Sequence, residues 1–467
     1  MTQTNIWWIR RDIRLQDNPA LDAALQNTDW MVPLFIIEPD LMANAAPKRR
    51  AFLLSALSDL DRELHERGSR LVVRQGPAAQ ALGVLTTELG GTIIHTQEDF
   101  SPFSRRRDEE IGNAFDLRLH QGEVLRHPTE ILKSDDNPYI VYTPYMRKWM
   151  DAPLPNPADC LPAPTHLPPL PEDLHTDNLP TARSVPGFPA TEKEAQARLT
   201  SFTGETIRRY QRERDRLDLA GTSQLSPYLR FGLLSIRQAF TQSQIAFLKA
   251  QDEQSRAEIR SWMNELIWRE FYSMILYHFP RVMTGPFRTE YQSLQWREAP
   301  EELRAWQQGF TGYPIVDACI RQLLETGWMH NRSRMIAASF LTKDLLINWQ
   351  EGESWFMENL IDGDPAANNG GWQWTAGTGT DAAPYFRIFN PILQGQKFDP
   401  DGTYITQWVP ELSSLPVRYR HEPWNLPDGQ ALDLHFQLGR DYPHPLVDHK
   451  FARLRTLDAY RSARTAS

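Results

Sequence analysis

Short apolar runs alternate with longer amphipathic stretches over the first 130 residues of the chain. The runs cover residues 6–9, 31–37, 71–73 and 92–95, and the amphipathic stretches cover residues 49–67, 77–89 and 104–115. This alternation predicts parallel strands with crossover helices, and therefore an α/β domain over residues 1–130. The expected sheet is Rossmann-like, but no G-x-G-x-x-G motif follows its first strand, so a dinucleotide site is not predicted there.

The pattern changes twice after residue 130. Eleven prolines lie between Pro153 and Pro189. Since proline cannot serve in a helix interior or a central strand, residues 131–195 are predicted to form an interdomain connector. Beyond it, apolar residues recur near the helical period in the stretches 196–211, 235–251, 255–277, 299–309, 315–326, 332–349, 351–360 and 448–463. We therefore expect an all-α domain over residues 196–467.

Residues 362–374 break both patterns. This stretch holds two carboxylates, two adjacent amides, three glycines and a proline beside Trp372 and Trp374. Large aromatic rings favour burial, and buried polar groups need partners. One interpretation is a loop folded around a planar, polar ligand, and the other is a Gly-rich turn whose tryptophans fill the core.

Composition narrows the class of protein. The chain of 467 residues has 41% hydrophobic and 23% charged residues, which is typical of a globular protein with two or three domains. No apolar run approaches 18 residues and no signal peptide is evident. Cys160 and Cys319 indicate no disulfide framework, so we expect a cytoplasmic protein without a membrane partner. The net charge of −9 disfavours nucleic acid only weakly, because a local basic face is sufficient for binding.

Two helical stretches carry candidate site residues. Glu265, Trp268 and Arg269 stand at i, i+3 and i+4, which gives one face a carboxylate, a flat ring and a guanidinium. The alternative is a surface ion pair beside a core tryptophan. Residues 328–335 also place polar and large side chains together, since Asn331, Arg334 and Met335 share one helix face.

A third candidate is a polar segment before a predicted helix. Residues 222–226 place hydroxyl groups and free amides at a helix start, which suits a phosphate, although by itself such a segment is more commonly a simple N-cap. Nine of the 15 tryptophans lie between Trp262 and Trp374. Spacing alone does not join Trp296, Trp349 and Trp372 into a set.

Together these segments resemble the photolyase–cryptochrome family over nearly the whole chain. The family opening W-x-R-R-D-L-R-L-x-D-N is matched at residues 8–18, with Ile13 replacing a leucine. Further matches are residues 264–271, 309–317, 327–335, 368–374 and 378–390. The pattern is most similar to class I cyclobutane pyrimidine dimer photolyases.

The resemblance implies an FAD, active as reduced, anionic FADH⁻, within the helical domain. The positions that match its diphosphate contacts are Tyr210, Thr222, Ser223, Gln224, Leu225 and Ser226. Those that match its other contacts are Trp262, Glu265, Arg269, Asn331, Arg334, Asp362, Asp364 and Asn368. Asn368 matches the residue beside flavin N5, and an amide there can accept a hydrogen bond. Trp372, Trp349 and Trp296 match the family's electron-transfer chain, and they can also be core residues.

The resemblance also implies DNA containing pyrimidine dimers as the partner of a monomeric carbon–carbon lyase. Light drives one electron from FADH⁻ to a flipped-out dimer, the cyclobutane ring splits, and the electron returns. Stacking walls and a polar group suit such a dimer, and the matching residues are Glu265, Trp268, Met335 and Trp374. The matches to backbone-contacting positions are Arg230, Arg332, Arg387 and Lys397, and these cations suit phosphates.

Two other activities occur in the same family. A (6-4) photolyase carries histidines where this chain has Asn331 and Met335, and its chemistry needs a proton donor. A cryptochrome photoreceptor is disfavoured by the combination of Trp268, Met335, Asn368 and Trp374 and by the lack of a long tail after the last predicted helix.

An antenna chromophore in the N-terminal domain is also expected. Folate-binding relatives carry an Asn-Glu pair and a histidine where this chain has Phe103-Ser104 and Asn44. The segment 102–104 instead looks like that of relatives that bind a deazaflavin. We therefore favour 8-hydroxy-deazaflavin over folate or FMN, and the remaining alternative is a domain without an antenna.

Overall fold

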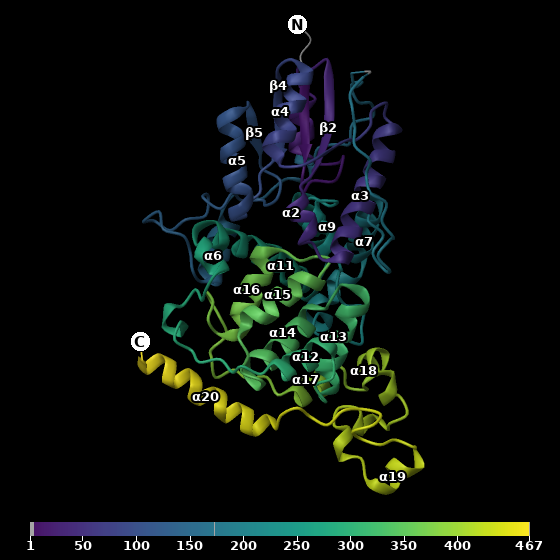
Figure 1. The fold of residues 1–467 in the computed structure, drawn as a ribbon, viewed down its shortest axis with the longest axis vertical. Coiled ribbons are helices and arrows are strands. Elements are labelled where there is room, and N and C mark those ends of the chain that lie inside the picture. The colour runs from purple at the N-terminus through teal and green to yellow at the C-terminus, as the bar shows by residue number, and fades with distance from the viewer. Residues whose placement is uncertain (1–3, 172, 467) are drawn as a thin grey trace. The chain divides into compact units, whose positions relative to one another are not determined.

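The computed structural model describes residues 4–171 and 173–466 and divides the chain into two compact units. Unit 1 consists of Met1–Gln211 and Thr222–Pro280, and unit 2 of Arg212–Gly221 and Arg281–Ser467. Unit 1 contains the sheet and the helices up to α11, and unit 2 is helical (Figure 1). The predicted fold class, α/β followed by all-α, is confirmed.

The sheet of unit 1 has five parallel strands in the order β3-β2-β1-β4-β5. The strands are β1 (Thr4–Ile9), β2 (Trp30–Ile37), β3 (Val72–Gln75), β4 (Thr92–Gln97) and β5 (Leu117–His120). Every residue of β1 is buried, as a central strand covered on both faces requires. The sequence pattern located the first four strands and missed β5, because its four residues Leu-Arg-Leu-His form no apolar run.

Eleven α-helices of unit 1 are described, of which α8 crosses into unit 2. They are α1 (Pro19–Ala24), α2 (Pro39–Ala43), α3 (Pro47–His65), α4 (Ala78–Leu89), α5 (Pro102–Ala114), α6 (Tyr142–Asp151), α7 (Glu192–Gly204), α8 (Tyr210–Glu213), α9 (Ser226–Phe231), α10 (Ile236–Lys249) and α11 (Glu253–His278). The helix α6 lies within the predicted connector and was not foreseen. The only proline of α6 lies in its first turn, where proline is tolerated. The prediction that proline excludes helices therefore applies only after residue 152.

A turn in unit 1 depends on a glycine. Gly232 has φ +66°, and a Cβ there would lie 1.9 Å from the backbone oxygen of Arg11. The side chain of Arg14, which is 1% exposed, donates to the oxygen of Gly232 over 3.0 Å. The loop after β1 is therefore fixed against the end of α9, and any larger residue at position 232 would push it away.

The connector after α6 covers the free edge of the sheet. The amide of Asp177 donates to the oxygen of Val73, and the amide of Val73 donates to the hydroxyl of Thr176. The edge strand β3 is thereby paired, which prevents it from recruiting another chain.

The helices of unit 2 surround an aromatic-rich core. They are α12 (Pro300–Gln308), α13 (Pro314–Thr326), α14 (Asn331–Ser339), α15 (Trp349–Asn359), α16 (Pro365–Ala376), α17 (Pro391–Phe398), α18 (Thr403–Trp408), α19 (Asp428–Asp433) and α20 (His449–Ala466). Among the described residues, no helix is long and apolar enough to cross a membrane.

The predicted helix over residues 332–349 is wrong in its second half. The α14 helix ends at Ser339, a π-helical turn covers Phe340–Asp344, and α15 begins only at Trp349. The turn is held by α20, where the hydroxyl of Thr456 donates to the oxygen of Lys343. A helical period in sequence does not reveal such an interruption, because the apolar residues continue through it.

Candidate active site

The helix α11 brings three predicted site residues onto neighbouring turns. Asp252 caps it by accepting a hydrogen bond from the amide of Ser255. Glu265, Trp268 and Arg269 are each half-buried, so their side chains lie at a surface of unit 1. Trp268 is therefore packed against neighbours on α11 and α6 and is also partly open to solvent.

Trp268 lies flat against Tyr142 of α6. Their ring centroids are 3.6 Å apart and their planes differ by 8°. The hydroxyl of Tyr142 donates to the backbone oxygen of Asn264, one turn before Trp268, over 2.9 Å. Tyr142 thus covers one face of the indole, and the partial exposure of Trp268 comes from the rest of the ring.

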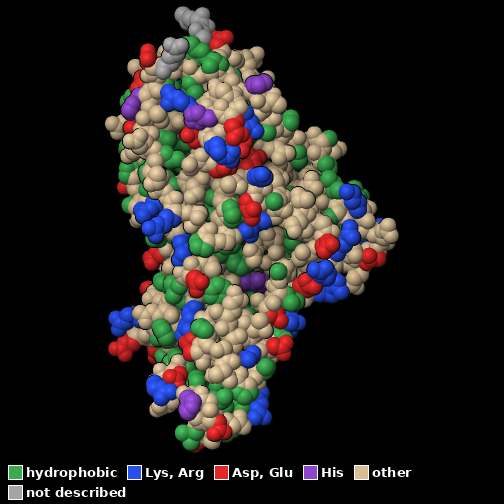
Figure 2. Space-filling model, turned by 90° about the vertical axis from the view of Figure 1, so that its right-hand side faces the viewer, with side chains coloured by type: hydrophobic (Ala, Val, Ile, Leu, Met, Phe, Trp, Pro, Cys, Tyr) green, Lys and Arg blue, Asp and Glu red, His purple; other side chains and the backbone are tan. Residues whose placement is uncertain are grey.

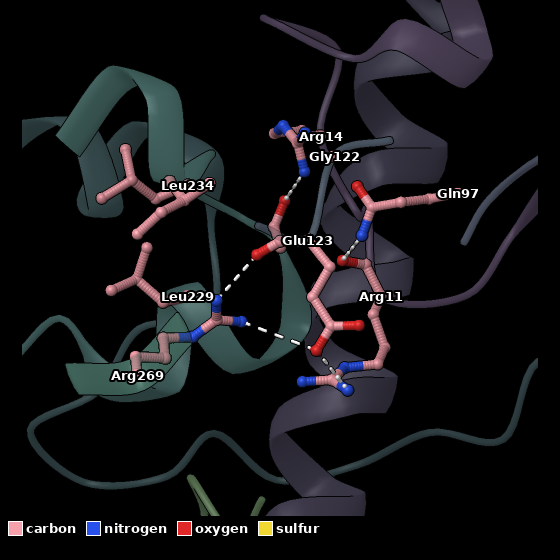
Figure 3. Close-up of a pocket in the computed structure, with 10 residues that line it drawn as sticks. Arg11, Arg14, Gln97, Gly122, Glu123, Leu229, Leu234 and Arg269 are labelled. Atoms are coloured by element: carbon pink, nitrogen blue, oxygen red, sulfur yellow. Dashed lines mark hydrogen bonds and ion pairs between the residues drawn. The ribbon is translucent and has the colours of Figure 1, made fainter. Parts of the chain in front are cut away.

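The guanidinium of Arg269 is fixed by Glu123. It donates to the backbone oxygen of Glu123 over 2.7 Å and lies 3.8 Å from its carboxylate, which is also 2.8 Å from the guanidinium of Arg11 (Figure 3). Glu123 was not predicted, and no sequence signal pairs it with a residue on α11. These contacts fix the orientation of the Arg269 side chain in the absence of a ligand.

The predicted diphosphate segment has no simple capping role. The short helix α9 follows Leu225, which makes no side-chain cap, so the alternative of an ordinary N-cap is wrong. Gln224 adopts φ +50°, and its amide oxygen accepts from Arg198 over 3.1 Å. Thr222 and Ser223 are half-buried. Tyr210 and Trp262 both pack against Phe202 in the same unit.

In unit 2 the start of α14 positions Asn331 and Met335. His330 caps the helix by accepting the amide hydrogen of Arg332 at its Nδ1. Burial lowers the pKa of His330 to about 4, so its ring stays neutral and able to accept. The amide nitrogen of Asn331 lies 3.9 Å from the sulfur of Met335, one turn further on.

Arg334 and Asp362, both of which match FAD contacts of the family, form an ion pair in unit 2. Their closest atoms, Nη2 and Oδ2, are 2.7 Å apart, and the Asp362 side chain is only 2% exposed. Arg334 also donates to the backbone oxygen of Met329. The second carboxylate oxygen, Oδ1 of Asp362, is buried and makes no hydrogen bond with the described residues. Such an atom needs a donor from a ligand or from water.

The interpretation of residues 362–374 as a loop is wrong, because α16 covers Pro365–Ala376. Asp364 caps this helix by accepting from the amides of Ala366 and Ala367, and Pro365 occupies its first position, where proline is tolerated. The glycines favoured a loop by propensity, but capping and packing against α15 outweigh this preference. Asp364 therefore has a structural role that the sequence did not indicate.

Asn368 is held on the buried side of α16. Its amide nitrogen donates to the backbone oxygen of Glu353 over 3.0 Å and to the carboxyl of Glu353 over 3.1 Å. Burial raises the pKa of Glu353, and the hydrogen bond from Asn368 opposes that shift. Both of these bonds use the nitrogen, so the carbonyl oxygen of Asn368 is the atom presented as an acceptor.

The three tryptophans of the predicted electron-transfer chain belong to one cluster of unit 2. Trp349 and Trp372 are 3% and 2% exposed, and the partly buried Trp296 packs against the same cluster. Trp372 contacts Phe356 edge to face at 4.9 Å. Trp374 is half-buried. Trp349 and Trp372 are therefore core residues, and Trp296 packs at the edge of the same core. This packing is compatible with the predicted role of the three residues in electron transfer.

The predicted DNA-contacting cations differ in their surroundings. Arg332 makes an ion pair with Asp215 at 2.8 Å and lies 4.5 Å above the ring of Phe398. Lys397 is exposed and lies 5.1 Å from the same ring. Arg387 is exposed as well, and Arg230, in unit 1, is half-buried. On the face drawn in Figure 2, basic and acidic side chains are interspersed.

No metal centre accompanies these residues in the described part of the chain. Over residues 4–171 and 173–466, no group of three His, Cys, Asp or Glu side chains could hold a metal ion.

The fold defines the class of the protein. A class III photolyase from Agrobacterium tumefaciens matches with a TM-score of 0.91 and 34% identity, covering 100% of this chain and 98% of its own. A cryptochrome from Synechocystis matches with a TM-score of 0.89 and 27% identity, covering 98% and 99%. The chain thus has the photolyase–cryptochrome fold.

Sequence comparison identifies the family within that class. The deoxyribodipyrimidine photo-lyase of Synechococcus is 40% identical over 99% of this chain and 97% of its own length. A family model described as DNA photolyase matches residues 5–165, and one described as the FAD binding domain of DNA photolyase matches residues 262–462. The chain belongs to the DNA photolyase family, and the resemblance inferred from its motifs is confirmed.

Proposed function

We propose that this protein splits cyclobutane pyrimidine dimers in DNA by light-driven electron transfer. The Synechococcus relative, which carries the name deoxyribodipyrimidine photo-lyase, supports this activity along the whole chain. The reaction breaks two carbon–carbon bonds, and the electron given to the dimer returns at the end. The enzyme is therefore a lyase and not an oxidoreductase.

FAD is the cofactor that the matched domain supports, and the buried polar atoms of unit 2 fit it. Oδ1 of Asp362 has no donor within the described part of the chain, and Asn368 presents a carbonyl oxygen, so a ring with N–H groups suits both. Arg334 would balance the charge at Asp362. In its reduced, anionic form FAD supplies the light-excited electron.

The residues of unit 1 proposed for FAD form a second set. Tyr210 and the segment 222–226 are proposed to hold the diphosphate. Trp262 and Arg269 are proposed to line the ribityl chain and the isoalloxazine ring. Arg269 suits this role because Glu123 already fixes its direction. A fixed guanidinium loses little conformational freedom when it binds.

For the dimer itself, Trp268 and Trp374 are proposed as stacking walls. Each is half-buried, which leaves ring surface for two fused pyrimidines. Glu265, one turn before Trp268, is proposed to bond the Watson–Crick edge and to stabilise charge on the reduced dimer. The chemistry of each side chain and its match to the family's pattern support these proposed roles.

The observation that carries the choice of lesion is the contact between Asn331 and Met335. The amide of Asn331 points to the sulfur of Met335 at 3.9 Å, and neither group can donate a proton as an acid. A (6-4) lesion, which requires a proton donor, is therefore not the proposed substrate. Met335 offers instead a polarisable contact to the dimer.

A repair assay tests the proposal. The purified holoprotein is incubated with an oligonucleotide that carries one cyclobutane dimer, in light and in darkness, and the remaining dimer is measured. We expect loss of the dimer only in light and no change in a matched (6-4) oligonucleotide. Photoreduction of the flavin without loss of the dimer would show a cryptochrome-like photoreceptor instead.

A Glu265→Gln variant gives the residue-level control. It keeps the shape of the side chain but removes its negative charge, so the repair per absorbed photon is expected to fall. Because Glu265 also matches an FAD contact, repair is expressed per bound FAD. Equal repair by both proteins would remove Glu265 from the proposed site.

We also propose an electron path to the flavin through Trp372, Trp349 and Trp296. The cluster that these three tryptophans share supports this path. Replacement of Trp296 by Phe should slow photoreduction of oxidised flavin while repair by pre-reduced enzyme is retained.

Four cations are proposed as phosphate contacts, namely Arg230, Arg332, Arg387 and Lys397. The exposure of Arg387 and Lys397 supports this proposal.

An antenna chromophore is proposed at the carboxyl ends of β1 and β4, where the strand order reverses. Arg10 and Arg107 lie on the ring of Trp8, each 4.8 Å from its centroid. Nε of Arg10, Nε of Arg107 and Oδ2 of Asp108 are buried without a hydrogen-bond partner among the described residues. We propose 8-hydroxy-deazaflavin. Extraction of the purified protein tests it, and recovery of folate or FMN would contradict it.

A monomer in the cytoplasm is the proposed state. Cys160 and Cys319 are free, which fits a reducing compartment. Light scattering after size exclusion should give the mass of one chain, and a dimeric mass would contradict this.

A further inference from the structure

The helix α6 lies along α11 and presents three aromatic side chains to it. Tyr142, Tyr145 and Trp149 are spaced i, i+3 and i+7 and are all buried, so they form one face of the helix. Tyr145 packs against Phe271 with a ring-centroid distance of 5.3 Å. The indole nitrogen of Trp149 donates to the carboxyl of Glu270 over 2.7 Å.

The first residue of this face reaches the proposed dimer wall. Tyr142 stacks on Trp268 at 3.6 Å, with nearly parallel planes, and its hydroxyl is tied to the oxygen of Asn264. Phe271 contacts the edge of the same indole at 5.6 Å and 87°. Tyr272, one turn further along α11, contacts the indole at 5.7 Å and 32°. Trp268 is therefore held by neighbours, while its side chain stays half-buried and partly open to solvent.

We infer that Tyr142 is a positioning residue for lesion recognition, which holds the indole of Trp268 in the plane that a flipped-out pyrimidine dimer stacks on. This inference rests on the proposed function of Trp268. A half-exposed tryptophan on a helix samples several χ1 and χ2 rotamers. Fixing one of them before binding removes an ordering cost from the complex with the dimer.

The Tyr142→Leu variant tests the inference. An aromatic pair contributes about 0.5–1.5 kcal/mol, so the affinity for dimer-containing DNA should fall about two- to tenfold. Affinity for undamaged DNA, FAD content and repair per photon at saturating DNA should stay those of the wild type. A purely structural role would instead lower FAD content and affinity for both DNAs together.

Two matched variants sharpen the result. Tyr142→Phe keeps the ring and should retain most of the affinity for damaged DNA. Tyr139→Leu removes a nearby half-buried tyrosine that packs on Tyr145 and not on Trp268, and it should leave discrimination unchanged. Equal losses for Tyr142→Leu and Tyr139→Leu would overturn the inference.

A double-mutant cycle separates this inference from the proposed function. If Trp268→Ala has no effect on discrimination between damaged and undamaged DNA, the proposed role of Trp268 fails. If Trp268→Ala weakens discrimination, Tyr142→Leu should cause no further loss in that background. Additive losses would show that Tyr142 acts elsewhere, and the proposed function would stand without it.

Discussion

The guanidinium of Arg334 and the carboxylate of Asp362 form an ion pair of 2.7 Å between the start of α14 and the segment before α16. One oxygen of Asp362 takes this bond, and the other is buried without a partner among the described residues. The pair thus joins two elements of unit 2 and leaves one acceptor for a ligand. Such a pair is balanced only while both charges are present.

Removing one member of this pair should be costly. We expect Arg334→Met to lower the free energy of unfolding by about 2–4 kcal/mol, because the buried carboxylate of Asp362 loses its counter-charge. Arg297 and Glu302 form a pair of the same length whose side chains are 31% and 27% exposed, and Arg297→Met should cost under about 1 kcal/mol. Denaturant unfolding of both variants measures this. Equal losses of unfolding free energy in Arg334→Met and Arg297→Met would contradict the prediction that the buried carboxylate of Asp362 depends on Arg334.

Gly352 allows α15 and α16 to approach closely. A Cβ at this position would lie 2.1 Å from Cη2 of Trp372 and 2.7 Å from Cδ2 of Leu341. We expect Gly352→Ala to destabilise the protein by about 1–3 kcal/mol through overpacking. A Cβ on Gly112, inside α5, would meet no atom within 4 Å, so Gly112→Ala should stabilise by about 0.5–1 kcal/mol. A lower Tm for Gly352→Ala and a higher Tm for Gly112→Ala than for the wild type would support this prediction.

The pair His95–His120 should make unit 1 sensitive to acid. Nδ1 of His95 lies 3.0 Å from Nε2 of His120, and burial lowers the pKa of His95 to about 4, with further lowering by His120 and Arg118 and an opposing effect of Asp116. The unfolded chain, with an ordinary histidine pKa near 6.5, binds the proton more readily. The stabilisation is therefore complete above about pH 6.5 and is lost as the pH falls towards 4, by at most about 3 kcal/mol.

Urea unfolding at a series of pH values measures this effect. His95→Phe removes the titrating group, so its free energy of unfolding should fall less steeply between pH 6.5 and 4 than that of the wild type. The exposed His65 serves as the control, and His65→Gln should keep the wild-type slope. Parallel slopes for His95→Phe and the wild type would contradict the prediction.

Lys397 and Arg332 should contribute unequally to DNA binding. The charge of Arg332 is already balanced by Asp215 at 2.8 Å, whereas Lys397 is exposed and lies beside the ring of Phe398. We expect Lys397→Met to reduce the slope of log affinity against log salt by about 0.9, the value for one lost phosphate contact in duplex DNA. Arg332→Met should reduce the slope less. Titrations of undamaged duplex between low and physiological salt measure both, and a larger effect of Arg332→Met would contradict the prediction.

The fold class and much of the secondary structure followed from the sequence. Apolar periodicity is a local property, so four strands, the helix α3 and the long helix α11 were placed within a few residues. The motifs were sufficient to identify the family, because several long segments recur in order. The placement of Glu265, Trp268 and Arg269 on one helix also required only their spacing.

Tertiary structure decided which partner each site residue has. Glu123 lies 146 residues before Arg269, and Asp215 lies 117 residues before Arg332, so no local pattern could pair them. The Gly-rich segment 365–376 became a helix because its capping residue and its packing against α15 outweigh its weak propensity. Tyr142 was overlooked for the same reason, since its aromatic spacing of i, i+3 and i+7 gains meaning only when α11 lies beside it. Sequence sets short-range periodicity and side-chain chemistry, whereas contacts between distant segments arise only when the chain has closed on itself.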